Sequence, residues 1–119
     1  MESKGRILVV DDDLAFANLI CRALENEGYV AALASDGLTA LEMLRTFRPD
    51  LVCLDMYLPE ISGWDFLKKY AVFLEPHVPI IAVSAANVDR ASLNGVSEFL
   101  QKPFDIVLLL NTVDRLLKH

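Results

Sequence analysis

The sequence predicts an α/β fold in which a five-stranded parallel sheet is flanked by helices. Five short apolar runs alternate with segments of helical periodicity, which is the pattern of repeated strand–helix units. Most of these runs lack polar alternation, as expected of strands that helices cover on both faces. The chain has 119 residues and is 54% hydrophobic, so we expect one domain over residues 1–119 with a sizeable core.

The expected strands are the apolar runs themselves, bounded by polar or turn-forming residues. In an open parallel sheet, ligands bind beyond the carboxyl ends of the strands, where the strand order reverses. For the order 2-1-3-4-5 this point lies between the first and third strands. The five runs are Arg6 to Val10, Tyr29 to Ala34, Leu51 to Leu54, Pro79 to Val83, and Glu98 to Gln101.

The first two helices have recognisable ends. The first is expected from Leu14 to Glu27 and should stop at Gly28, because glycine adopts a positive φ at little cost. The second opens near Asp36, a good N-cap, and is closed by Pro49. Helical spacing assigns inward positions to Phe16, Leu19, Ile20, Ala23 and Leu24 in the first helix, and to Leu38, Leu41 and Leu44 in the second.

The remaining helices differ in length. The third is expected over about Gly63 to Leu74, before Pro76 and Pro79. Only Val88 to Leu93 can form a turn or two between the fourth and fifth strands, so the fourth helix should be short. The last helix starts near Asp105. Its inward positions are Ile106, Leu109, Leu110, Val113 and Leu117, which leaves Val107 and Leu108 outside the stripe.

Composition excludes several classes of protein. The net charge of −6 opposes direct binding of the nucleic-acid backbone. No apolar run approaches the ~20 residues of a membrane span, and the first residues resemble neither a secretory signal nor a lipidation motif. We therefore expect a cytoplasmic protein without a membrane partner. Cys21 and Cys53 have no metal-type or redox-type spacing and are interpreted as core residues.

Polar residues stand at four of the five strand ends. Asp11, Asp12 and Asp13 follow the first strand, Asp55 the third, Ser84 the fourth and Lys102 the fifth. Taken singly, each has an ordinary explanation as a turn former, a cap or a solvated charge, and for Asp13 we expect helix capping. Their order at successive strand ends favours a shared functional site.

The first and third strand ends should bring three carboxylates into one cleft. Two unit charges ~4 Å apart repel by ~4 kcal/mol at an effective dielectric of ~20, so the cluster must bind protons or a cation. Short carboxylate side chains suit Mg²⁺. Asp55 is then the candidate nucleophile for a phosphoryl group, with Lys102 neutralising charge and the Ser84 hydroxyl donating a hydrogen bond.

These motifs resemble the receiver domains of two-component response regulators over essentially the whole chain. The resemblance implies a flavodoxin-like receiver fold with sheet order 2-1-3-4-5. This chain departs from the family between Ser84 and Lys102, a stretch about one helical turn shorter than usual, so the fourth helix should be shortened. The segments that carry it are Ile7 to Asp13, Pro49 to Pro59 with Gly63, Pro79 to Ala85, and Lys102 to Phe104.

Read residue by residue, the resemblance implies a metal-assisted acceptor. Asp12 and Asp55 would bind Mg²⁺ directly, Asp11 through water, and Tyr57 through its carbonyl. Asp55 would accept the phosphoryl group, and Lys102 would pair with it. Such a domain is a signalling module that assists its own phosphorylation and dephosphorylation, and not an enzyme in the ordinary sense.

The resemblance also implies a switch and partners. Ser84 would move toward the phosphoryl group while Phe99 changes rotamer, although Phe99 lacks the hydroxyl that is frequent there, so it must act by packing alone. The Lys102–Pro103 peptide is expected to be cis. The donor would be a sensor histidine kinase or phosphotransfer protein, and the reader a downstream effector, an output domain or, in a phosphorylation-dependent homodimer, a second copy.

Three alternatives remain open at this point. A haloacid-dehalogenase-type phosphatase is suggested by Asp11 and Asp13, but it needs acidic ligands after Lys102, where only Asp105 and Asp114 occur. A flavodoxin-like cofactor binder would need a phosphate-cradling loop where this chain has three aspartates. A receiver that has lost phosphorylation would be a constitutive interaction module.

Overall fold

Five strands form one parallel sheet in the order β2-β1-β3-β4-β5, which confirms the predicted fold class. The computed structural model describes residues 3–73 and 78–119. The second strand begins one residue later than predicted, the third extends by one residue to include Asp55, and the fourth is shifted by one residue, so that it begins at Ile80 and ends at Ser84. The strands are β1 (Arg6–Val10), β2 (Val30–Ala34), β3 (Leu51–Asp55), β4 (Ile80–Ser84) and β5 (Glu98–Gln101).

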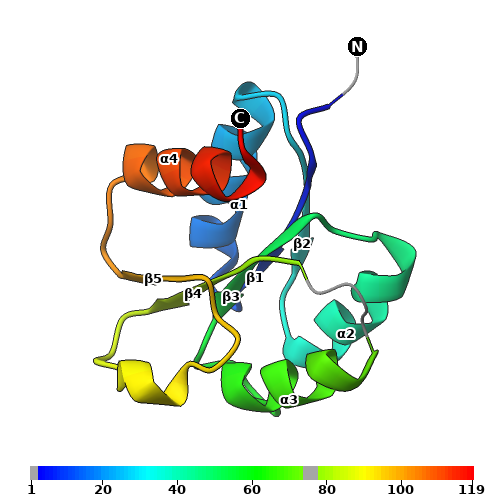
Figure 1. Ribbon diagram of the computed structural model, residues 1–119, viewed down its shortest axis with the longest axis vertical. Coiled ribbons are helices and arrows are strands. Elements are labelled where there is room, and N and C mark those ends of the chain that lie inside the picture. Colours follow the sequence, from blue (N-terminus) through cyan, green and yellow to red (C-terminus); the bar gives the residue numbers. More distant parts are fainter. Residues whose placement is uncertain (1–2, 74–77) are drawn as a thin grey trace.

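Four α-helices cover the sheet on both faces. Helices α1 (Leu14–Asn26) and α4 (Ile106–Leu117) lie on one face, and α2 (Gly37–Thr46) and α3 (Gly63–Phe73) lie on the other (Figure 1). Between β4 and β5 only the 3₁₀ turn η1 (Arg90–Ser92) forms, so the predicted shortening of the fourth helix is confirmed. Leu74 and Pro76, at the predicted end of the third helix, lie outside the described residues.

Aspartates cap three of the helices, as the sequence predicts. The Asp13 carboxylate accepts from the backbone N–H of Phe16, that of Asp36 from Thr39, and that of Asp105 from Val107. Each bond satisfies a backbone donor that has no partner inside the helix. Gly28 follows α1 with a φ of +99°, a conformation that favours glycine.

The register of the sheet aligns the strand ends that carry polar residues. Val10 of β1 pairs with Leu54 of β3, so Asp11 and Asp55 are the next residues on neighbouring strands. The carboxyl ends of β4 and β5 continue the same edge, because Ser84 pairs with Gln101 directly before Lys102. The parallel pairing therefore gathers the predicted functional residues at one edge of the sheet.

Two apolar clusters form the core, one on each face of the sheet. The predicted inward positions of Leu19 and Leu38 are wrong, because these side chains are 56% and 50% exposed. Ala17, Cys21 and Ala40 are buried, since small side chains let a helix backbone approach the sheet closely. The remaining predicted stripe residues are buried or partly buried, as are both cysteines.

Burial raises the pKa of the Cys21 thiol to about 11 and that of Cys53 to about 12, which fits their role as core residues.

Within the described residues, no helix combines the length and the apolar character that crossing a membrane requires.

Candidate functional site

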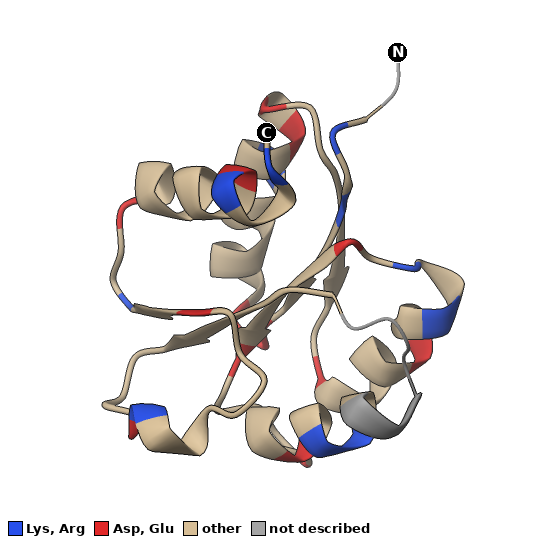
Figure 2. Cartoon of the chain, in the orientation of Figure 1, with Lys and Arg blue, Asp and Glu red and all other residues tan. Residues whose placement is uncertain are grey.

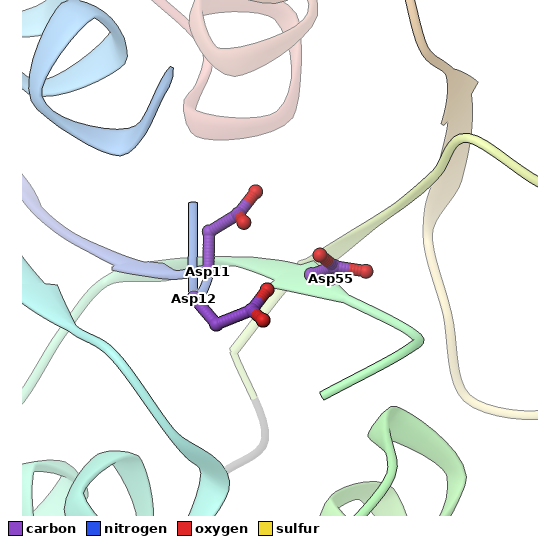
Figure 3. A group of neighbouring side chains, drawn as sticks. All are labelled: Asp11, Asp12 and Asp55. Atoms are coloured by element: carbon purple, nitrogen blue, oxygen red, sulfur yellow. The ribbon is translucent and has the colours of Figure 1, made fainter. Parts of the chain in front are cut away.

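Three carboxylates meet at the carboxyl edge of the sheet. Each of Asp11, Asp12 and Asp55 offers one oxygen atom such that all three atoms lie within 4.8 Å of one another. Figure 3 shows Asp12 and Asp55 turned toward the same space, with Asp11 beside them. Asp11 and Asp55 are 3% and 8% exposed, whereas Asp12 faces solvent. The cluster is thus buried at Asp11 and Asp55 and open to solvent at Asp12.

Backbone hydrogen bonds orient the two buried carboxylates. The N–H of Tyr57 donates to Asp55 Oδ1 over 2.9 Å, and the N–H of Asp13 donates to Asp11 Oδ1 over the same distance. Both bonds span two residues, as in an Asx turn. In each aspartate one oxygen is held by the chain, and the other, Oδ2, faces Lys102.

Lys102 is the cation of the site. Its Nζ lies 2.8 Å from Asp11 Oδ2 and 3.6 Å from Asp55 Oδ2. The residue directly follows β5, and its backbone N–H donates to the carbonyl of Ser84. The Lys102–Pro103 peptide is cis, as the resemblance implies. The ammonium pairs with two of the three clustered carboxylates, Asp11 and Asp55, and one positive charge against three negative ones leaves negative charge that a divalent cation can neutralise.

The crowding of charge shifts the pKa values of Asp55 and Lys102. Burial raises the pKa of Asp55, and the neighbouring Asp11 charge adds to this, while the Tyr57 N–H and the Lys102 ammonium act in the opposite direction. For Lys102, burial lowers the pKa, but the hydrogen bond and charge of Asp11 and the charge of Asp55 outweigh it, so the pKa is raised. Lys102 thus stays charged at neutral pH.

The two predicted switch residues, Ser84 and Phe99, lie on the neighbouring strands β4 and β5. Ser84 is fully buried, and its hydroxyl both donates to the carbonyl and accepts from the N–H of Ala86, each over 3.0 Å. Phe99 is partly buried in the core cluster beneath α2 and α3, and the guanidinium of Arg90 lies 5.3 Å from its ring centroid. The Ser84 hydroxyl must break its hydrogen bond to the Ala86 carbonyl before it can donate one to a ligand at Asp55.

Phe99 and the exposed apolar residues of α4 come from different layers of the fold. Phe99 packs on the α2–α3 face of the sheet, whereas α4 packs on the other face. Val107 and Leu108 are nevertheless 58% and 49% exposed. Figure 2 shows that the first turns of α4 carry no charged residues. Val107 and Leu108 therefore give α4 an exposed apolar surface.

Two aromatic contacts at the site were not foreseen. Phe16 was assigned only to an inward helical stripe, yet its ring centroid lies 4.4 Å from Lys102 Nζ. The ring of Trp64 packs against that of Tyr57, and its Nε1 donates to Ser92 Oγ over 3.1 Å. Such contacts depend on how separate segments pack, for which helical spacing provides no signal.

The two acids after Lys102 have other partners. The Asp105 carboxylate caps α4, and that of Asp114 accepts from the Tyr29 hydroxyl at the opposite end of the sheet's strands. A haloacid-dehalogenase-type phosphatase, which needs metal ligands there, is therefore not favoured.

Comparison with known proteins agrees with this geometry. A family model of the response regulator receiver domain matches residues 7–114. The chain is 37% identical over 105 residues to the DNA-binding response regulator MtrA of Mycolicibacterium paratuberculosis, covering 85% of this chain and 46% of that protein. It is also 37% identical over 117 residues to the transcriptional regulatory protein ZraR of Klebsiella oxytoca, covering 95% and 26%. The chain thus spans less than half the length of these relatives.

Solved structures show the same architecture. A CheY-like response regulator receiver domain protein from Methanospirillum hungatei JF-1 has a TM-score of 0.88 at 30% identity, covering 99% of this chain and 95% of that one. A signal receiver domain from Bermanella marisrubri has a TM-score of 0.83 at 34% identity, covering 97% and 98%.

Proposed function

The chain belongs to the response regulator receiver domain family, and on this premise we propose that Asp55 is the residue that accepts the phosphoryl group. The family is a phosphoryl-accepting signalling module of two-component systems. The observation that carries the assignment is the position of Asp55 at the end of β3, between the carboxylates of Asp11 and Asp12 and the ammonium of Lys102. Asp11 shares these neighbours, but its Oδ2 is paired with Lys102 over 2.8 Å, whereas that of Asp55 lies 3.6 Å from the same ammonium.

The metal in this proposal is Mg²⁺. Three hard carboxylate oxygens and an open side fit a small divalent cation that keeps several waters. Asp12 and Asp55 would hold it directly, Asp11 through water, and Tyr57 through its carbonyl. When bound, the cation neutralises phosphoryl charge during transfer.

In the proposed reaction an Asp55 carboxylate oxygen attacks phosphorus in line with the leaving group. A phosphorus–oxygen bond forms while the donor's phosphorus–nitrogen bond breaks, and the leaving imidazole of the donor histidine takes up a proton. Lys102 already lies 3.6 Å from Asp55 Oδ2, so a small movement brings its ammonium to a phosphoryl oxygen. The positive charge then offsets the charge of the acyl phosphate.

The switch we propose starts at Ser84. A phosphoryl oxygen competes with the Ala86 carbonyl for the Ser84 hydroxyl, and breaking that bond frees the segment after β4. Phe99 is partly buried against the core on the same side as this segment, so it can repack as the segment moves. The coupling would be on the order of 1–3 kcal/mol, as is typical between linked sites.

The partners also belong to the proposal. A sensor histidine kinase or phosphotransfer protein would be the donor, and an output domain or effector the reader, because the chain corresponds to only part of longer relatives that are named as DNA-binding or transcriptional regulators. We infer a cytoplasmic location, a single receiver domain over residues 1–119 and, after phosphorylation, association of two copies.

Incubation with Mg²⁺ and a small acyl-phosphate donor tests the function. Intact mass should rise by one phosphoryl group, and the label should be stable to acid and labile to base. Asp55→Asn should abolish it, whereas Asp65→Asn, at an exposed position of α3, should not. Undiminished labelling of Asp55→Asn would overturn the assignment.

A further inference from the structure

An aromatic ring forms part of the environment of the Lys102 ammonium. The Nζ atom lies 4.4 Å from the centroid of Phe16, a residue in the first turn of α1. The ring is itself braced by Phe104, with a centroid separation of 5.6 Å and an interplanar angle of 82°. Asp11, Asp55, Phe16 and Phe104 line the same small cavity. Phe16 is therefore held in place by neighbours that also surround the site.

The ring and the carboxylates attract the ammonium in different ways. A carboxylate accepts a directional hydrogen bond, as Asp11 Oδ2 does over 2.8 Å. The face of an aromatic ring attracts a cation through its quadrupole, and this attraction depends less on where the N–H bonds point. Lys102 can thus turn its N–H donors from Asp11 toward a group on Asp55 while its contact with Phe16 persists.

We propose that Phe16 is a positioning residue that holds the Lys102 ammonium between Asp11 and Asp55 and so prepares it for the phosphoryl group. The inference rests on the proposed function, in which Lys102 neutralises that group. A free lysine side chain must lose rotamer freedom when it engages a ligand. Because Phe16 orders the side chain before the phosphoryl group arrives, part of this loss is removed from the reaction step.

The contact between Phe16 and Lys102 should change the rate of phosphorylation by a moderate factor. A cation over an aromatic face corresponds to about a 2- to 5-fold change in rate at partly exposed sites and more where water is excluded. Phe16→Leu should slow phosphorylation of Asp55 by an acyl-phosphate donor by this factor or more. Mg²⁺ affinity should stay within about twofold, because Phe16 contributes no metal ligand.

A fluorinated series separates the electronic role of the ring from its packing. Mono-, di- and trifluorophenylalanine at position 16 keep the shape of the side chain and progressively weaken the negative face of the ring. The logarithm of the phosphorylation rate should fall steadily with fluorine number. The same series at Phe47, whose ring lies 4.3 Å from the Arg6 guanidinium at the other end of β1, is the matched control and should leave the rate unchanged.

Nuclear magnetic resonance provides a readout that does not depend on phosphorylation. The ε-methylene protons of Lys102 should resonate upfield of free lysine because of the ring current, and Phe16→Leu should abolish the shift. An unshifted signal in the wild type, a flat rate series at position 16, or an equal decline in the Phe47 series would each overturn the positioning role while labelling of Asp55 remained intact. Loss of labelling in the unmodified protein would instead contradict the proposed function.

Discussion

Lys102 forms its shorter ion pair with Asp11 and not with Asp55, at 2.8 Å against 3.6 Å. Without a phosphoryl group, the ammonium therefore neutralises mainly the carboxylate beside the acceptor. It competes there with any cation that the carboxylates bind. This competition leads to the first prediction.

Lys102→Met should destabilise the metal-free protein and tighten the binding of Mg²⁺. Loss of the ammonium leaves the buried Asp11 carboxylate without its charge partner, at a cost of about 2 kcal/mol in the free energy of unfolding. Removal of the competing charge should strengthen Mg²⁺ binding about tenfold. Chemical denaturation and calorimetric titration measure the two effects. Lys68→Met, on the exposed side of α3, is the control, and weaker Mg²⁺ binding in Lys102→Met would refute the competition.

Asp12 and Asp13 are adjacent but should behave differently. Asp12→Ala removes one crowded charge, so metal-free stability should be unchanged or higher while Mg²⁺ affinity falls at least about tenfold. Asp13→Ala removes the N-cap of α1 and should cost about 1 kcal/mol while Mg²⁺ binding changes little. Titration followed by Trp64 fluorescence, together with thermal unfolding, separates the two variants. A loss above ~2 kcal/mol in metal-free Asp12→Ala would contradict the charge-cluster account.

The raised pKa of Asp55 predicts a specific pH dependence. Because the folded state holds this proton more tightly than the unfolded state, stability from Asp55 is present at low pH and is lost as the pH rises through its raised pKa. Mg²⁺ affinity should change in the opposite direction and fall as the pH drops through the same range, since protons compete for the ligand. The difference between wild type and Asp55→Asn, measured against pH, isolates this contribution. An affinity that stays constant down to the ordinary Asp range would contradict the assigned shift.

The exposed residues of α4 are the predicted docking surface. Val107→Glu combined with Leu108→Glu should abolish association of the phosphorylated protein with a partner or a second copy, because it places charge on an apolar contact. Beryllofluoride stands in for the phosphoryl group, and sedimentation reports association. Leu19→Glu, an equally exposed leucine on α1, is the control. Association of the double variant at wild-type strength would place the output surface elsewhere.

The strand ends were predictable because they depend on short local patterns. Asp36 and Asp105 cap helices where their sequence context predicts it, and the parallel order brings Asp11 and Asp55 together without any knowledge of side-chain packing. Leu19 and Leu38 are exposed although the sequence predicts them inward, because a prediction from hydrophobicity assigns large apolar side chains to the core. Close packing of a helix on a sheet instead favours small ones such as Ala17 and Ala40.

Details of the candidate site depend on contacts between distant segments. Three such details depend on how the loops pack against the helices. They are the 3.6 Å separation of Lys102 Nζ from Asp55 Oδ2, the hydrogen bonds between the Ser84 hydroxyl and Ala86, and the position of the Phe16 ring near the ammonium. None has a periodic signature in the sequence. The likeness to the family indicates which residues form the site, and the structure indicates how they are arranged without a phosphoryl group.

The most direct test of the central claim locates the phosphoryl group on the chain. The protein is incubated with Mg²⁺ and a small acyl-phosphate donor, and borohydride then reduces the acyl phosphate of a labelled aspartate to homoserine, which peptide mass spectrometry can locate. The account predicts homoserine at position 55 in the wild type and none at any position in Asp55→Asn. Homoserine at Asp11, Asp12 or Asp13 in the wild type, with Asp55 unmodified, would contradict it.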